Sequence, residues 1–104
     1  MAIVKATFLL PVKDNDGSDL LPEIRIARRG LWSRFSAYTN EGEVEGVYMM
    51  ADGSEANDVH KKITLIVDDS RLRDLEEVLR DFKAKTTQET IYLEILRGVE
   101  LRLL

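Results

Sequence analysis

The sequence predicts an α+β domain in which an antiparallel sheet and two helices form two layers. Two observations predict this fold class. Residues 62–67 and 90–97 alternate apolar side chains with a period of two, which is typical of strands. The residues between them repeat apolar side chains at helical spacing. A strand, a helix and a second strand therefore follow one another in residues 62–97, and a crossover of this kind joins strands of one sheet.

Composition is that of one globular domain spanning residues 1–104. The chain is 44% apolar and 33% charged, which excludes a disordered protein. No apolar run approaches the roughly 20 residues of a membrane helix, and the N-terminus lacks a signal-peptide layout, so we expect a cytoplasmic protein without a membrane partner. With no cysteine and one histidine, disulfides, thiolate nucleophiles and two-histidine metal motifs are excluded. We expect no cofactor.

The first half of the chain predicts a strand, a helix and two extended segments. Residues 3–10 alternate as a strand, which Pro11 ends or marks as an edge. Polar turn residues follow, and then a helical stripe over residues 20–31. Because residues 24–26 alternate briefly, residues 23–29 could instead be a strand. Two further extended segments follow, at residues 34–39 and 43–50, before the turn signal Asp52-Gly53-Ser54.

The second half repeats the order with clearer signals. Residues 62–67 are apolar on both faces, which indicates a central strand. Asp68, Asp69 and Ser70 are candidates for the N-cap of a helix over residues 71–83. The charged face of that helix is expected to be solvated, and residues 90–97 form the last strand.

Short motifs resemble a group of small uncharacterised bacterial and phage proteins of similar length. The motifs are Arg34-Phe35, Gly46-Val47-Tyr48, Asp52-Gly53 and Gln88-Glu89-Thr90-Ile91-Tyr92-Leu93-Glu94. The element order likewise resembles a ferredoxin-like α+β sandwich, in which two helices cover one face of an antiparallel sheet. The resemblance spans residues 3–97, and this chain departs from the group at Tyr48, where a tryptophan is expected. The resemblance implies the fold but does not imply a function.

Charge and aromatic residues predict a surface for a protein partner. Four arginines surround the only tryptophan, and an acidic segment, residues 41–58, holds no lysine or arginine. Arginine and tryptophan are enriched at interface hot spots, and the acidic segment offers a complementary surface on a second copy or another protein. The predicted partner-binding residues are Arg25, Arg28, Arg29, Trp32, Arg34, Glu41, Glu43 and Glu45.

We therefore expect a small, non-catalytic interaction domain that self-associates. The outer sheet face keeps Ile66, Tyr92 and Leu96, a potential apolar patch, and no catalytic constellation accompanies it. Nucleic-acid binding is disfavoured, because the pI is ≈ 5.0 and nucleic-acid-binding domains normally exceed about 9. One alternative is a phage- or plasmid-encoded inhibitor whose acidic hairpin imitates nucleic acid.

A second alternative is a small enzyme or ligand-binding protein that uses the open sheet face. Tyr48, His60, Tyr92 and Glu94 are its candidate residues, because histidine and carboxylates transfer protons near neutral pH. A partly exposed structural histidine and cross-strand packing are the simpler interpretation of the same residues.

Asp14, Asp16 and Glu23 match the latter part of a calcium loop. Oxygen ligands at alternate positions, a glycine and a distal acid are what calcium requires. Val12 stands at the first ligand position, however, and a strand precedes the loop. An ordinary polar turn followed by an acidic residue at a helix start is the favoured interpretation.

Overall fold

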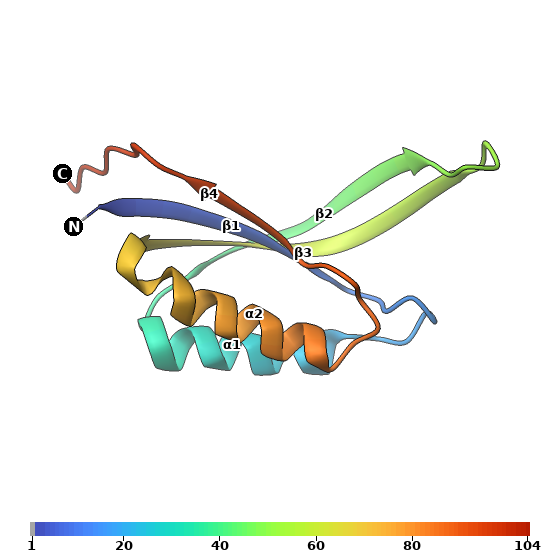
Figure 1. Ribbon diagram of the computed structural model, residues 1–104, viewed down its shortest axis with the longest axis horizontal. Coiled ribbons are helices and arrows are strands. Elements are labelled where there is room, and N and C mark those ends of the chain that lie inside the picture. Colours follow the sequence, from blue (N-terminus) through green and yellow to red (C-terminus); the bar gives the residue numbers. More distant parts are fainter. Residues whose placement is uncertain (1) are drawn as a thin grey trace.

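A computed structural model describes residues 2–104 of the chain. Four strands form one sheet, in the order β2-β3-β1-β4 with each neighbouring pair antiparallel. Two helices cover one face of this sheet, and the other face is open (Figure 1). The fold is therefore the predicted ferredoxin-like α+β sandwich. Its elements are β1 (Ile3–Pro11), α1 (Leu21–Phe35), β2 (Thr39–Met49), β3 (Glu55–Asp68), a 3₁₀ turn (Asp69–Arg71), α2 (Leu72–Ala84) and β4 (Tyr92–Leu96).

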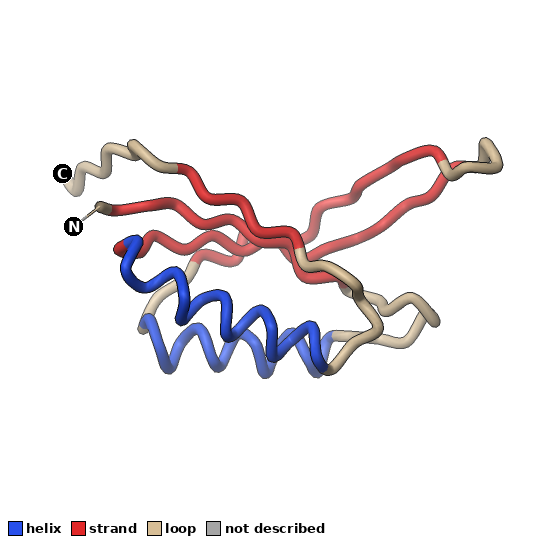
Figure 2. Tube along the Cα trace, in the orientation of Figure 1, coloured by secondary structure: helices blue, strands red, loops and turns tan. Residues whose placement is uncertain are grey.

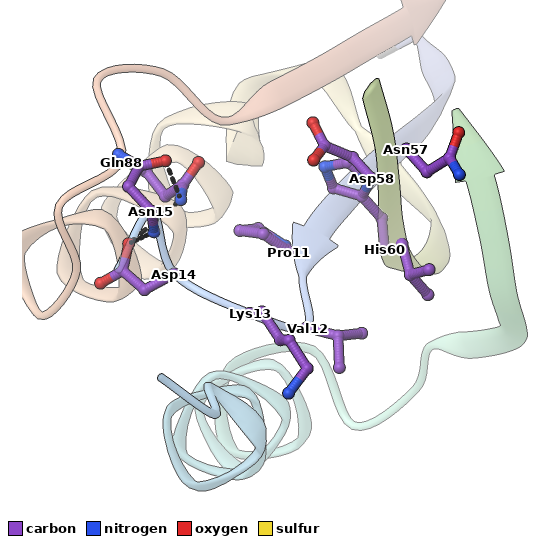
Figure 3. Close-up of a pocket in the computed structure, with 10 residues that line it drawn as sticks. Pro11, Val12, Lys13, Asp14, Asn15, Asn57, Asp58, His60 and Gln88 are labelled. Carbon is purple, nitrogen blue, oxygen red and sulfur yellow. Dashed lines mark hydrogen bonds between the residues drawn. The ribbon is translucent and has the colours of Figure 1, made fainter. Parts of the chain in front are cut away.

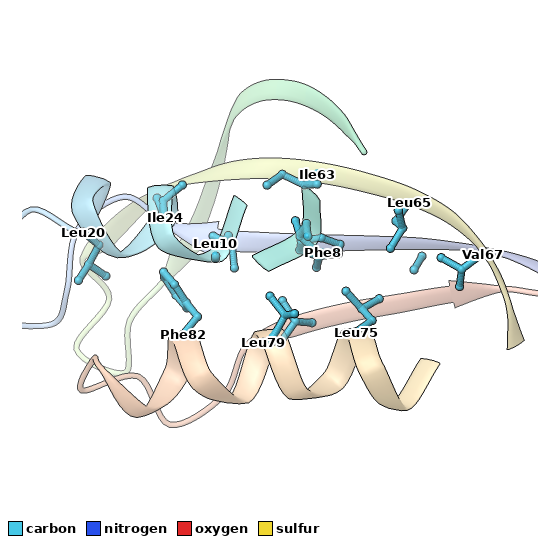
Figure 4. Close-up of a cluster of buried hydrophobic side chains, with 14 of the residues drawn as sticks. Phe8, Leu10, Leu20, Ile24, Ile63, Leu65, Val67, Leu75, Leu79 and Phe82 are labelled. Atoms are coloured by element: carbon cyan, nitrogen blue, oxygen red, sulfur yellow. The ribbon is translucent and has the colours of Figure 1, made fainter. Parts of the chain in front are cut away.

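The hydrophobic core lies between the two central strands and the helices (Figure 4). Phe8 pairs with Ile63 across β1 and β3, and both side chains are buried against the helix layer. Leu31 of α1 and Leu75 of α2 are likewise fully buried. Burying a side chain of this size contributes roughly 1.5–3 kcal/mol to the stability of the fold. The buried apolar side chains of the strands and helices therefore stabilise the contact between the two layers.

Residues 23–29 are helical, which resolves the alternative left open above. They lie inside α1, whose apolar residues Ile24 and Ala27 are buried. The predicted strand at residues 34–39 is wrong except at Thr39, where β2 begins, because residues 36–38 connect α1 to that strand outside any helix or strand. Arg34 and Phe35 are the last residues of α1, which ends where Ser36 adopts φ 58° and its N–H donates to the carbonyl of Trp32.

Strands β2 and β3 are longer than predicted and reach past the helix layer (Figure 2). We call residues 43–60 the hairpin arm. The Asp52-Gly53-Ser54 turn closes it as predicted, with Gly53 at φ 85° and the Asp52 carboxylate accepting from the Ser54 N–H at 2.9 Å. The arm gives the molecule its extended dimensions of 47 × 26 × 22 Å.

The chain continues past β4 as residues 97–104, which lie outside any helix or strand. Strand β4 itself covers residues 92–96, shorter than the predicted 90–97. Within residues 2–104, no helix combines the length and apolar character needed to cross a membrane.

Candidate functional site

Four residues at helical spacing form one outward face of α1. Arg25, Arg28, Arg29 and Trp32 surround a shallow depression of about 330 Å³, which Tyr38 completes. The Arg28 Nε donates to the Tyr38 hydroxyl at 3.0 Å. Trp32 is 63% exposed, and within residues 2–104 none of these three arginines forms a salt bridge. We call these five residues the α1 patch.

Arg34 does not belong to this patch, although it was predicted with it. Its guanidinium reaches the other helix, where Nη1 lies 2.7 Å from Glu77 Oε2. The hydrogen bond to Glu77 raises the pKa of Arg34 above its ordinary value. Arg34 therefore connects α1 to α2 and is occupied within the chain.

The predicted acidic residues lie on β2, and two of them are paired within the chain. Glu41 accepts from the Thr64 hydroxyl and lies 3.8 Å from Lys62 Nζ, while Glu43 lies 3.3 Å from Lys61 Nζ. The Thr64 hydrogen bond, assisted by Lys62, lowers the pKa of Glu41. Glu45 forms no salt bridge within residues 2–104.

The hairpin arm exposes apolar side chains along its length. Met49 is 78% exposed, which is large for an apolar side chain on a strand. The other exposed apolar residues of the arm are Val47, Tyr48, Met50 and Val59. The arm thus combines an acidic character with an apolar surface that nothing within the described chain covers.

The open sheet face carries the four predicted ligand-face residues, but as separate groups. The Tyr48 hydroxyl donates to Asp58 Oδ2 at 2.6 Å, and the Tyr92 hydroxyl donates to Glu94 Oε2 at 2.9 Å. Each carboxylate raises the pKa of its tyrosine. His60 lies beside Pro11 across β1 and β3. The four residues therefore do not converge on one cavity.

A network of hydrogen bonds joins two loops that are far apart in sequence. The Asp14 carboxylate accepts from the Thr87 N–H at 2.9 Å, the Thr87 hydroxyl at 2.6 Å and Gln88 Nε2 at 3.1 Å. Asn15 Nδ2 donates to the Thr87 carbonyl at 2.9 Å. These bonds, the Thr87 hydroxyl first, lower the pKa of Asp14 to about 2. We call Asp14, Asn15, Thr87 and Gln88 the loop clasp.

A cavity of about 420 Å³ lies beside this clasp. Figure 3 shows Asp14, Asn15 and Gln88 of the clasp on one side of Pro11, with Asp58 and His60 of β3 on the other. Lys13 and Asn57 also line this space, which we call the loop cavity. Sequence reasoning noticed the Asp14-Asn15 turn and the Gln88 motif separately. It missed their contact, because 73 positions separate Asp14 from Thr87.

The three acids of the proposed calcium loop have three separate roles. Asp14 belongs to the loop clasp, and Asp16 accepts from the Ser18 N–H and hydroxyl. Glu23 lies in the first turn of α1, where its Oε2 is buried without a hydrogen-bond partner. The loop is thus organised by internal hydrogen bonds, as in an ordinary polar turn.

No family model and no curated protein matches the sequence. Solved structures do resemble the fold. The divalent ion tolerance protein CutA1 from Ehrlichia chaffeensis superposes with a TM-score of 0.65, at 11% identity over 97% of this chain and 85% of that chain. CutA1 from Oryza sativa gives a TM-score of 0.66, at 12% identity over 98% and 84% of the two chains. Likeness at this identity shows a shared α+β fold.

Proposed function

We propose that the protein is a small, non-catalytic interaction domain that self-associates. In this proposal, the hairpin arm of one copy lies against the α1 patch of the next. The single observation that carries it is the arm, a long two-stranded projection with exposed apolar side chains. Two-stranded hairpins are marginally stable on their own in water, so such an arm gains stability when a partner covers it.

Charge complementarity selects the α1 patch as the surface that receives the arm. The patch holds three arginines without an acidic partner in residues 2–104, in a chain whose formal net charge is −4. The arm supplies Glu45 and Glu55, which are exposed and form no salt bridge in the described chain. Trp32 offers the arm an aromatic surface beside these charges, a composition typical of interface hot spots.

A contact between two different surfaces has a consequence for the assembly. Because arm and patch are distinct, each copy can donate its arm to one neighbour and receive the arm of another. Heterologous contacts of this kind give closed rings, or filaments when the rotation does not close. The proposal therefore expects a mass that is an integral multiple of 11.9 kDa and allows more than two copies.

Charge reversal on each surface, measured by light scattering coupled to size-exclusion chromatography, tests the contact. Arg29→Glu and Glu45→Arg should each weaken association by about tenfold or more, because each places like charges opposite one another. The double variant should recover much of the loss, since the reversed charges attract again. Arg73→Glu is the matched control, because Arg73 is exposed on α2 and the charge change is identical.

Two results would contradict the proposal. Wild-type protein that stays monomeric at every concentration measured would exclude self-association. Assembly that persists equally in Arg29→Glu, Glu45→Arg and the Arg73→Glu control would move the interface away from the arm and the patch. Recovery in the double variant is the decisive observation, because unfolding of either single variant could not produce it.

One of the structures that share this fold is a divalent ion tolerance protein, so the fit of a metal ion to this chain can be assessed. Structural and catalytic zinc sites use three or four protein ligands. Residues 2–104 contain no group of three or more histidine, cysteine, aspartate or glutamate side chains positioned for one ion. Asp58 and His60 offer a pair only. The residues present in one copy do not fit such a site, and the proposed function does not include one.

A further inference from the structure

The loop clasp occupies the amide donors of Gln88 on one wall of the loop cavity. Gln88 Nε2 donates to both Asp14 Oδ1 and Asn15 Oδ1, at 3.1 and 3.2 Å, which occupies both of its hydrogens. Asn15 Nδ2 is likewise directed to the Thr87 carbonyl. This pattern fixes the orientation of the Gln88 amide, because only its nitrogen can donate to a carboxylate. The Gln88 Oε1 is therefore the free polar atom of this residue, and it is an acceptor.

The opposite wall also presents acceptors. Asp58 and His60 are two residues apart on β3, so their side chains share one face of the strand. Asp58 Oδ2 accepts from the Tyr48 hydroxyl, which leaves Oδ1 without a protein donor in the described residues. A neutral histidine adds one acceptor nitrogen. Figure 3 places both side chains across the cavity from the clasp, above Pro11.

We propose that the loop cavity binds a small organic cation that carries several N–H donors, such as an alkyl guanidine or a primary amine. The free acceptors on the two walls, Gln88 Oε1 and Asp58 Oδ1, would receive these donors, and Asp58 would supply the opposite charge. Asp14 adds a second negative charge close by, held ionised because its pKa is about 2. The cavity, at about 420 Å³, accommodates a ligand of this size.

Lys13 limits which cations enter. It is the only lysine or arginine among the lining residues, and Figure 3 shows its side chain directed away from Asp58 and His60. The lining holds two carboxylates, Asp14 and Asp58, against this one lysine, so its formal charge is negative. The ammonium of Lys13 would repel a ligand that carries a second cation at that side, so a monocation should bind more tightly than a longer polyamine.

Calorimetric titration of the folded protein with n-butylguanidine and with n-butylamine, each a monocation at neutral pH, tests the proposal. Choline is the matched probe, because it carries a permanent positive charge on a quaternary nitrogen that has no N–H donor. We expect saturable binding of n-butylguanidine or n-butylamine with a dissociation constant on the order of 0.1–1 mM. Binding of choline should be about tenfold weaker or more, because the acceptors would lose their donors.

Asp58→Asn identifies the site. This variant keeps the size of the side chain and an oxygen for the Tyr48 hydroxyl but removes the charge, so binding should weaken by about tenfold or more. Asp52→Asn removes the same charge at the tip of the arm and should leave binding unchanged. The side-chain amide signal of Gln88 in a ¹H–¹⁵N spectrum should shift on titration, which reports on the cavity independently of heat.

Three outcomes would overturn the proposal. The first is no saturable binding of either n-butylguanidine or n-butylamine up to about 10 mM, a tenfold excess over the weakest expected constant. The second is choline binding as tightly as n-butylguanidine, which would indicate unspecific charge attraction. The third is equal loss in Asp58→Asn and Asp52→Asn with no shift at Gln88. The cavity lies apart from the α1 patch but shares residues 57–60 with the hairpin arm, so light scattering on Asp58→Asn and Asp52→Asn separates loss of ligand binding from loss of self-association.

Discussion

At the scale of single residues, Asp14 shows how one carboxylate can organise two loops. Its oxygens accept from Asn15, Thr87 and Gln88, and these bonds stabilise the ionised form. The pKa of Asp14 is consequently about 2, below its ordinary value of 3.8. Because the folded-state pKa is depressed, this contribution to stability is fully present above about pH 4 and is lost as the pH falls from 4 to 2.

Replacing Asp14 with asparagine should open the loop clasp without unfolding the protein. The neutral amide keeps one acceptor oxygen but lacks the charge and the second oxygen, so the Thr87 N–H should exchange faster with solvent. Hydrogen exchange followed by NMR at neutral pH measures this rate, and wild-type protein near pH 2 should show the same loss of protection relative to an unprotected amide at that pH. Asp16→Asn should instead affect the Ser18 N–H, which its carboxylate binds. Equal exchange at Thr87 in both variants would contradict the role of Asp14.

At the scale of elements, α1 and α2 pack closely because Gly30 faces Val78. A Cβ built on Gly30 would lie 3.6 and 3.7 Å from the two Val78 methyl carbons, which is ordinary van der Waals contact. A glycine inside a helix is nevertheless unfavourable by roughly 0.5–1 kcal/mol relative to alanine, because it loses more backbone entropy on folding.

Gly30→Ala should therefore raise the free energy of unfolding by roughly 0.5–1 kcal/mol, as measured by urea denaturation. Gly53→Ala is the contrasting variant, because Gly53 has φ 85° and alanine is strained there. It should lower the free energy of unfolding, although an added Cβ would meet no neighbouring atom there. A loss of stability in Gly30→Ala would mean that the two helices cannot accept an added methyl group.

The elements themselves were largely predictable, since alternation in β1 and β3 and the stripe in α2 are local patterns. The end of α1 was not. Residues 34–39 alternate as a strand would, yet Arg34 is held in the helix by its salt bridge to Glu77. The Arg71 guanidinium also lies over the ring of Phe35, with its carbon 4.5 Å from the ring centroid. Both contacts are made by residues of the 3₁₀ turn and α2, which are distant in sequence from the end of α1. A local sequence pattern therefore could not predict them.

At the scale of the whole molecule, some of the charged residues predicted to bind a partner form salt bridges within the chain, and others do not. The sequence supplies the arginines and acids of the predicted interface, but it does not indicate which of them form salt bridges within the chain. Arg34, Glu41 and Glu43 are occupied within the chain. The three arginines of the α1 patch and Glu45 form no salt bridge within residues 2–104. Whether two charged side chains form a salt bridge depends on their positions in three dimensions. The proposed interface therefore contains fewer of the predicted charged residues.

Salt should weaken the proposed assembly. The Debye length falls from about 10 Å at 0.1 M to about 3 Å at 1 M, so attraction between the arm and the α1 patch is screened. Sedimentation velocity at low and high sodium chloride should show a shift toward the monomer as salt rises. A distribution that is unchanged, or that shifts toward larger species, would mean that apolar burial by residues such as Met49 drives association instead of charge.

The position of Trp32 makes the α1 patch optically distinct. It is the only tryptophan of the chain, and its indole is largely exposed on the outer side of α1. Excitation near the red edge of protein absorption therefore addresses one known point of the surface, with no label attached. An indole moved from water into an apolar contact emits at shorter wavelength, so the unmodified protein carries its own fluorescent reporter for whatever covers this helix.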